Sequence, residues 1–285
     1  MKILFLAVFL HKDIQIDEID INLPFNKLIN MLSKNLKKYI TSLHHKKYRK
    51  QHSAFCAEGD KLNHDLITSK MHCAELLATS EWLNKNKKLL LKGIKTTEVS
   101  KSELKSLSNL KSVPPVIGIY NIAEYQLNIE RLSDSLVLAL DGVQDPGNLG
   151  TIIRVADWFG INNIICSNES ADIYNPKVVQ ASMGAIARVT VHYTNLCTFI
   201  EEYRSKNNLP VYGTFLKGEN IYNHSLSKSG MVVMGSEGKG ISSEIEKLIS
   251  DKLFIPNFPL DEPTSESLNV SVATAIACSE FRRGK

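Results

Sequence analysis

The regular alternation of short apolar runs with helix-forming segments, across residues 135–285, most constrains how this chain folds. Residues 135–141 (SLVLALD) form a continuous apolar run, which is typical of a strand covered on both faces of its sheet. A loop rich in turn formers follows, and then a segment of helical period that ends at Gly160. This order repeats to residue 285 and predicts a doubly wound α/β domain with a parallel sheet.

Ligands of doubly wound sheets bind beyond the carboxyl ends of the strands. We therefore expect the functional site in the loops that follow four predicted strand ends, at Asp141, Thr214, Gly235 and Pro256.

Residues 31–120 also alternate between predicted strands and helices, which indicates a small α/β domain, with Ser33 as the cap of its first helix. A polar, weakly patterned linker is expected over residues 121–134. The small domain opens with a basic run that reaches Glu58 before any acidic residue. Four cations of this run are predicted to bind a polyanionic partner, the alternative being an ordinary solvated helix face: Lys46, Lys47, Arg49 and Lys50.

Residues 1–30 fit this pattern poorly, so we expect an irregular or non-native extension, with either Met1 or Met31 as the native start. The opening apolar run lacks a small-residue cleavage site and is far shorter than the ~20 residues that span a bilayer. The five cysteines are odd in number and lack metal-ligand spacing. We expect reduced thiols, no metal, no membrane and a cytoplasmic location.

Three segments that follow predicted strands are rich in polar side chains, and the first two also contain glycine. In residues 145–154 (DPGNLGTIIR), Gly147 and Gly150 permit a tight turn and close approach to a ligand, and Asn148 can cap the next helix. Residues 234–242 (MGSEGKGIS) match neither a P-loop nor the dinucleotide fingerprint, but expose backbone groups suited to an adenine or amino-acid moiety. In residues 266–283, polar residues precede a helix rich in small side chains.

In their order, their spacing and their residues, these segments resemble the three motifs of the SpoU/TrmH family of RNA ribose 2′-O-methyltransferases, part of the SPOUT class. The run SLNVSVA, at residues 267–273, resembles the third motif of the family at every position. The basic run and the AEG turn that follow Met31 resemble the small RNA-binding domain that precedes the catalytic domain in many ribosomal-RNA members. One departure is the segment between Pro256 and Ser267, which is several residues longer than the family leads us to expect.

The resemblance implies a trefoil knot in the catalytic domain, S-adenosylmethionine as methyl donor, a homodimer, and an RNA site that crosses the subunit interface. It implies that the cofactor is bound by Gly235, Gly240, Ile255 and Leu268. It makes Arg154 the residue that activates the 2′-hydroxyl. Because arginine stays protonated in proteins, we favour a role as phosphate anchor and electrostatic stabiliser of the developing alkoxide.

The resemblance also implies that ribose and arginine are held in place by Asn148, Glu237, Ser267 and Asn269, with Glu237 able to pair with Arg154. The predicted activity is methylation of a ribose 2′-hydroxyl, in 23S ribosomal RNA by preference because of the two-domain layout. A tRNA substrate and a non-catalytic RNA-binding module are the alternatives, and the intact polar residues argue against the second.

Overall fold

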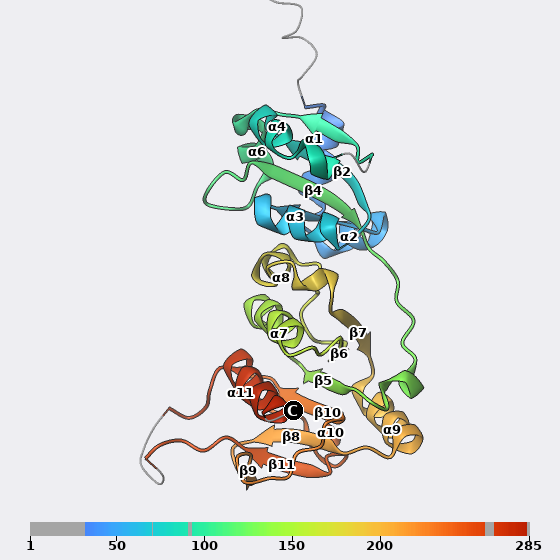
Figure 1. Ribbon diagram of the computed structural model, residues 1–285, viewed down its shortest axis with the longest axis vertical. Coiled ribbons are helices and arrows are strands. Elements are labelled where there is room, and N and C mark those ends of the chain that lie inside the picture. Colours follow the sequence, from blue (N-terminus) through green and yellow to red (C-terminus); the bar gives the residue numbers. More distant parts are fainter. Residues whose placement is uncertain (1–31, 70, 91–92, 260–264, 284–285) are drawn as a thin grey trace, which may run out of the picture. The chain divides into compact units, whose positions relative to one another are not determined.

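The structure is a computed structural model that describes residues 32–69, 71–90, 93–259 and 265–283 (Figure 1). The predicted extension at residues 1–30 lies outside the described residues, as does part of the long segment before Ser267. By its internal contacts, Leu32–Lys285 forms one compact unit.

A four-stranded sheet with the order β1-β4-β2-β3 organises the N-terminal part of this unit. β4 is antiparallel to both of its neighbours, and β2 runs parallel to β3. Ser33 caps α1 as predicted, because its side chain accepts a hydrogen bond from the Leu36 amide. The elements are α1 (Lys34–Ser42), α2 (Lys46–His52), β1 (Ala54–Glu58), α3 (Asp60–Thr68), β2 (Cys73–Ala78), α4 (Ser80–Lys85), α5 (Lys87–Leu90), β3 (Thr96–Glu98), α6 (Lys101–Leu107) and β4 (Val116–Asn121).

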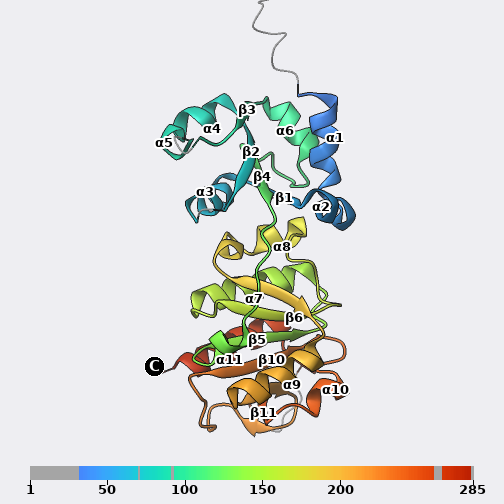
Figure 2. The ribbon, with the colours of Figure 1, turned by 90° about the vertical axis from the view of Figure 1, so that its right-hand side faces the viewer.

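A seven-stranded sheet with the order β7-β6-β5-β10-β8-β11-β9 organises the C-terminal part, and all its pairings are parallel (Figure 2). The predicted doubly wound α/β fold is thereby confirmed. The elements are β5 (Leu136–Asp141), α7 (Pro146–Trp158), β6 (Asn163–Ser167), α8 (Pro176–Ala181), β7 (Thr190–Thr194), α9 (Leu196–Asn207), β8 (Val211–Phe215), β9 (Glu219–Asn220), β10 (Gly230–Gly235), α10 (Ser243–Glu246), β11 (Asp251–Phe254) and α11 (Val270–Arg282).

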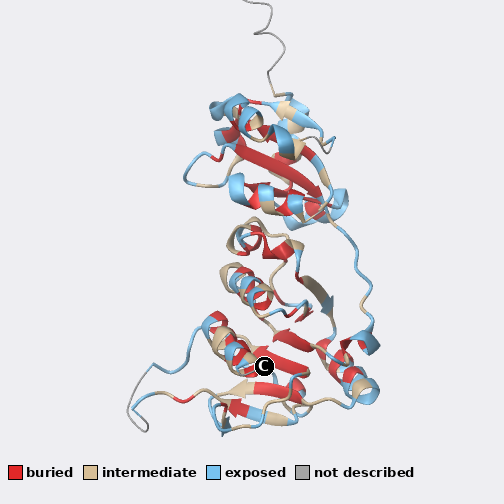
Figure 3. Ribbon diagram, in the orientation of Figure 1, coloured by how far each residue is buried: buried red, intermediate tan, exposed pale blue. Residues whose placement is uncertain are grey.

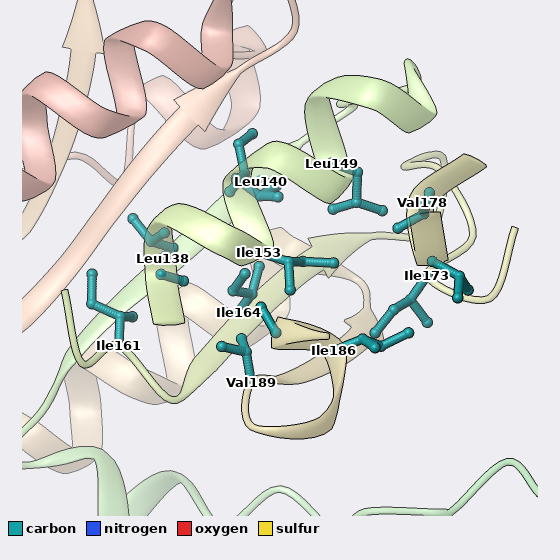
Figure 4. Packing of buried hydrophobic residues seen from close by; sticks show 14 of the residues in the cluster. Leu138, Leu140, Leu149, Ile153, Ile161, Ile164, Ile173, Val178, Ile186 and Val189 are labelled. Carbon is teal, nitrogen blue, oxygen red and sulfur yellow. The ribbon is translucent and has the colours of Figure 1, made fainter. Parts of the chain in front are cut away.

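The central strand β5 is buried on both faces, as its continuous apolar run predicts. Leu138 and Leu140 pack into one core cluster with α7, α8 and α11, and Figure 4 shows them beside Leu149 and Ile153 of α7. The residue between them, Ala139, joins a second cluster with α9 and α10 on the opposite face. Helices therefore cover both sides of the sheet, and the buried strands appear as its red centre in Figure 3.

The strand order reverses between β5 and β10, which makes this the topological switch point of the sheet. β6 and β7 extend to one side of β5, and β8, β11 and β9 lie beyond β10. Gly235, the last residue of β10, pairs in register with Asp141, the last residue of β5. Two of the predicted loops therefore leave the sheet side by side at the point where such folds bind ligands.

Two features differ from the sequence expectation. The predicted polar linker contains a 3-10 turn, Ile129–Leu132, whose two end residues are buried against the second cluster. The two-residue strand β9 was not predicted, because Glu219–Asn220 is too short to show a period. Among the described residues, no helix has both the length and the apolar character needed to cross a membrane.

Candidate active site

The first predicted segment forms the N-terminus of α7, which begins earlier than expected. Asp145, not Asn148, is the cap: its Oδ1 accepts a hydrogen bond from the Asn148 amide over 2.8 Å. Pro146 occupies the first helical position, where its missing N–H costs nothing. The side chain of Asn148 is consequently available for a contact outside the helix.

Gly147 and Gly150 both lie within α7 rather than in a tight turn. A Cβ added to Gly150 would lie 2.6 Å from the Cβ of Ala181 and 2.8 Å from the carbonyl oxygen of Val178, both in α8. Gly150 therefore permits close packing of α7 against α8 rather than the approach of a ligand.

The second segment forms a closed loop after β10. The amides of Ser236 and Gly240 each donate to the other's carbonyl, over 3.1 and 2.8 Å. A Cβ at Gly235 would lie 2.1 Å from the carbonyl carbon of Gly240, so this position admits only glycine. The loop is also tied to β5, because the Ser242 amide donates to Asp141 Oδ2 over 2.7 Å. Asp141 is a supporting residue that the sequence reading missed.

The third segment places Asn269 at the N-terminus of α11, where its side chain makes contacts in two directions. Oδ1 accepts hydrogen bonds from the Ser271 and Val272 amides and so caps the helix. Nδ2 donates to Asn148 Oδ1 over 2.9 Å and to Glu237 Oε1. Backbone amides can only donate, so they determine which end of the Asn269 side chain carries the oxygen.

The structure thus joins three of the predicted catalytic residues, one from each segment, into the cluster Asn148–Glu237–Asn269. Within the described chain, no hydrogen bond is found for the Asn148 amide nitrogen Nδ2 or for Glu237 Oε2. The cluster therefore offers one donor and one carboxylate oxygen to a ligand. Ser267 is exposed at the start of the same segment and lines the neighbouring pocket.

Arg154 lies apart from this cluster. It is exposed on α7 and, within the described chain, forms no ion pair or hydrogen bond, so the predicted pairing with Glu237 is absent here. Six helical residues separate Arg154 from Asn148, which carries it about 240° around the helix axis, onto another face. It shares that face with Trp158, four residues on, whose side chain is 84% exposed.

A pocket of about 680 Å³ opens beside the cluster, and all four predicted cofactor residues line it. Gly235 and Gly240 come from the closed loop, Ile255 follows β11, and Leu268 precedes α11. Two predicted catalytic residues, Glu237 and Ser267, line the same pocket. The size is that of a site for a small molecule.

The predicted RNA-binding cations divide into two groups. Lys46, Lys47 and Lys50 are exposed on α2. Arg49 is only 3% exposed: its Nη1 donates to the carbonyls of Leu43 and His44, and its Nη2 forms a 2.6 Å ion pair with Asp172. The Arg49 guanidinium is therefore committed to contacts inside the protein.

Neither a metal cluster nor an activated thiol is present in the part of the chain that the structure describes. No group of three or more His, Cys, Asp or Glu side chains is placed to hold a metal ion there. Burial raises the pKa of Cys56 and of Cys278 to about 12, so both thiols are protonated near neutral pH. The polar groups that the structure brings together at the site are the amides of Asn148 and Asn269 and the carboxylate of Glu237.

Comparison with known families yields two matches. Residues 135–279 match the SpoU rRNA Methylase family. Residues 35–118 match the MRM3-like substrate binding domain.

Individual relatives extend over most of the chain. The 23S rRNA (guanosine(2553)-2′-O)-methyltransferase RlmP of Bacillus subtilis is 29% identical over 84% of this chain and 93% of its own. A solved structure from Porphyromonas gingivalis, of a protein assigned to the TrmH family of RNA methyltransferases, is 38% identical with a TM-score of 0.78, over 90% of this chain and all of the other. The AdoMet-bound rRNA methyltransferase of Sinorhizobium meliloti is 27% identical with a TM-score of 0.78, over 90% and 97%.

Proposed function

Because this chain belongs to the SpoU rRNA methylase family, we propose that it transfers a methyl group from S-adenosylmethionine to a ribose 2′-hydroxyl of ribosomal RNA. The observation that carries this proposal is the cluster Asn148–Glu237–Asn269, which joins the three family motifs beside a pocket of small-molecule size. The activity named for the Bacillus subtilis relative supports the choice of ribosomal RNA over tRNA.

The pocket suits S-adenosylmethionine in both size and chemistry. Closure of the loop at Gly235 leaves backbone groups, rather than side chains, against that wall, and backbone amides and carbonyls suit an adenine edge. Leu268 and Ile255 add apolar surface, and the acidic Glu266 and basic Lys217 at the lining suit an amino-acid group. When bound, the cofactor supplies an electrophilic methyl group and a neutral thioether as leaving group.

The side chains of the cluster would align the ribose. Asn148 Nδ2 is a donor for a ribose or phosphate oxygen, and Glu237 Oε2 can accept a hydrogen bond from the 2′-hydroxyl. Alignment of the attacking oxygen with the methyl carbon accounts for much of the rate gain in such displacements. The exposed Ser267, on the wall of the pocket, lies where it can contact the ribose.

Arg154 would complete the site from a second subunit. Its face of α7 also carries Trp158, a large apolar side chain of the kind that subunit interfaces cover. Val272 of the adjoining helix α11 is also exposed. We infer a homodimer in which the guanidinium of one protomer anchors an RNA phosphate and stabilises the developing alkoxide at the cluster of its partner.

The rest of the chain would serve RNA recognition. We propose that residues 31–120 form the RNA-binding domain, residues 121–134 the linker and residues 135–285 the catalytic domain with a knotted C-terminal segment. The match to a substrate binding domain supports the first assignment. The five cysteines are free thiols, which suits a reducing compartment, and we place the reaction in the cytoplasm.

The direct test is methyl transfer from radiolabelled S-adenosylmethionine to protein-free ribosomal RNA and to tRNA, followed by nuclease mapping of 2′-O-methylated positions. We expect one resistant phosphodiester in 23S ribosomal RNA, formed equally well in the presence of EDTA. Label on a base, or on tRNA alone, would contradict the proposal.

A further inference from the structure

The α1–α2 groove is a hollow on the small domain formed by the first two helices, with a volume of about 470 Å³. Helix α1 buries Ile40 in the core of the small domain. Lys38 and Tyr39 of the same helix line the groove, and Tyr39 also packs against that core. His45, Tyr48 and His52 are contributed by α2 and the turn before it. The spacing of His45, Tyr48 and His52 places them on one face of the second helix.

The groove is aromatic rather than aliphatic. The Tyr39 and His52 rings bridge the two helices, with centroids 5.0 Å apart at 90°. His45 and Tyr48 form a second pair at 6.4 Å. Tyr48 is 38% exposed, and both histidines are also exposed. Exposed rings of this kind offer a flat surface on which a planar ligand can stack.

The surroundings of the groove are cationic. No Asp or Glu occurs between residues 32 and 57, and none of the described side chains that line the groove is a carboxylate. Lys38 lies in the groove, and Lys47 Nζ lies 5.8 Å from the centroid of the Tyr48 ring. Because this cation lies over the Tyr48 ring, a ligand that stacks on the ring would have positive charge close by.

Arg49 holds the two helices in this arrangement. Its Nη1 binds the carbonyls of Leu43 and His44, at the end of α1 and in the turn, over 2.9 Å each. Because Arg49 itself belongs to α2, the guanidinium fastens the second helix to the end of the first. The groove is consequently formed before any ligand arrives.

We propose that the α1–α2 groove binds an unpaired nucleobase of the substrate RNA by stacking, with the flanking phosphates on Lys38 and Lys47. This inference rests on the proposed function, because it assigns the small domain to RNA. Exposed aromatic rings close to lysines suit a single strand, because every base has a π-face that can stack on a ring and every nucleotide carries a negative charge. A duplex keeps its bases paired and cannot insert one.

The test measures binding of the full-length protein to a fluorescent oligoadenylate and to a duplex RNA of equal length. Tyr48→Ala should weaken oligoadenylate binding about tenfold and leave duplex binding unchanged. Tyr48→Phe should bind as the wild type does, because stacking needs the ring and not the hydroxyl. The matched control is Tyr222→Ala, which removes a tyrosine of similar exposure, 40%, outside the groove.

Salt titration separates stacking from charge. Tyr48→Ala should retain the wild-type salt slope, whereas Lys47→Ala should lower it.

Unchanged oligoadenylate affinity in Tyr48→Ala and His45→Ala, with normal thermal unfolding, would overturn the proposal and leave the groove to an acidic protein partner. Methyl transfer to ribosomal RNA is measured in parallel. If the variants methylate ribosomal RNA normally and their oligoadenylate affinity is unchanged, only the role of the groove is ruled out. If the wild-type protein fails to methylate any RNA, the proposed function itself is ruled out.

Discussion

Asn269 Nδ2 donates a hydrogen bond to Asn148 Oδ1 over 2.9 Å, although the two residues stand 121 positions apart. The other end of the Asn269 amide caps α11, so the start of this helix and the start of α7 are aligned by a single side chain. Since Asn148 accepts with its oxygen, its own nitrogen remains the donor available to substrate. The orientation of the Asn269 side-chain amide therefore determines the orientation of the Asn148 side-chain amide.

Replacing Asn269 with Asp should separate helix capping from catalysis. Asp is an equally good cap, so the unfolding free energy should change little. A carboxylate cannot donate to Asn148, and it would repel Glu237, so we expect kcat/KM to fall about thirtyfold, or ~2 kcal/mol. Urea unfolding and single-turnover methylation measure the two effects. Asn269→Ser, which caps without adding charge, should lose less, and equal losses in both variants would argue against the repulsion.

Replacing Arg154 with Ala should abolish most methyl transfer and spare cofactor binding, because Arg154 does not line the pocket. The loss should lie chiefly in kcat, at roughly 100-fold or more, as for a group that stabilises developing charge. Arg154→Lys should rescue poorly, since lysine lacks the planar fork. Arg131→Ala, at another exposed arginine, is the matched control. Near-normal single-turnover rates in Arg154→Ala, with cofactor binding verified by calorimetry, would remove this residue from the site.

Mixing two inactive variants should reveal whether the site is shared between subunits. Dimers that combine an Arg154→Ala subunit with an Asn269→Asp subunit contain one intact composite site. After refolding of an equal mixture, about one quarter of the wild-type rate should return, because half of the dimers are mixed and each has one working site. If every subunit used its own Arg154, the mixture would stay inactive.

Replacing Lys46, Lys47 and Lys50 together with Ala should lower the salt dependence of RNA binding. Each phosphate that is no longer neutralised by a lysine reduces the slope of log affinity against log salt by about 0.7 to 0.9, so the three replacements together should change it by roughly 2 to 3. Calorimetric cofactor affinity should not change. The control is the triple Ala variant of Lys85, Lys87 and Lys88, exposed lysines of the same domain. If the salt slope of the Lys46, Lys47 and Lys50 variant is unaltered, these lysines form an ordinary solvated helix face and do not bind RNA phosphates.

Replacing Arg49 with Ala should destabilise the protein rather than alter its salt dependence. The change leaves Asp172, whose side chain is 16% exposed, without its cation and two carbonyls without their donor. We expect a loss of about 3 kcal/mol in the free energy of unfolding, measured with urea. Asp172→Asn, which keeps an acceptor for the guanidinium, should cost less. A stable Arg49→Ala protein with a reduced salt slope would return Arg49 to the phosphate-binding group.

The strands other than β9 and the positions of the three loops could be predicted, because both depend on local pattern. The run ending at Asp141 is apolar at every position because Leu138 and Ala139 face opposite clusters, and no tertiary information is needed to read it. The start of α7 was also readable: Pro146 at the first helical position points to Asp145 as the cap, in place of the predicted Asn148.

Other features depend on contacts that local sequence does not encode. Arg49 stands among lysines in a basic run, and its ionic partner inside the protein, Asp172, lies 123 residues away. Arg154 is separated from Glu237 in part because it lies six positions after Asn148 in a helix, which places it on a different face of that helix. The bond between Asn148 and Asn269 could not be predicted, because α7 and α11 are far apart in sequence and only the fold packs them together.

The closed loop at Gly235 also bears on how the enzyme is reset after each reaction. Its reciprocal hydrogen bonds and its tie to Asp141 are formed within the protein, so the conformational entropy of ordering this wall is lost during folding and not at each binding event. On the function proposed above, backbone groups of this wall would contact the adenine end, which the spent cofactor shares with the fresh one. The wall would then discriminate weakly between them, and we expect the demethylated product to compete for the pocket until it is removed.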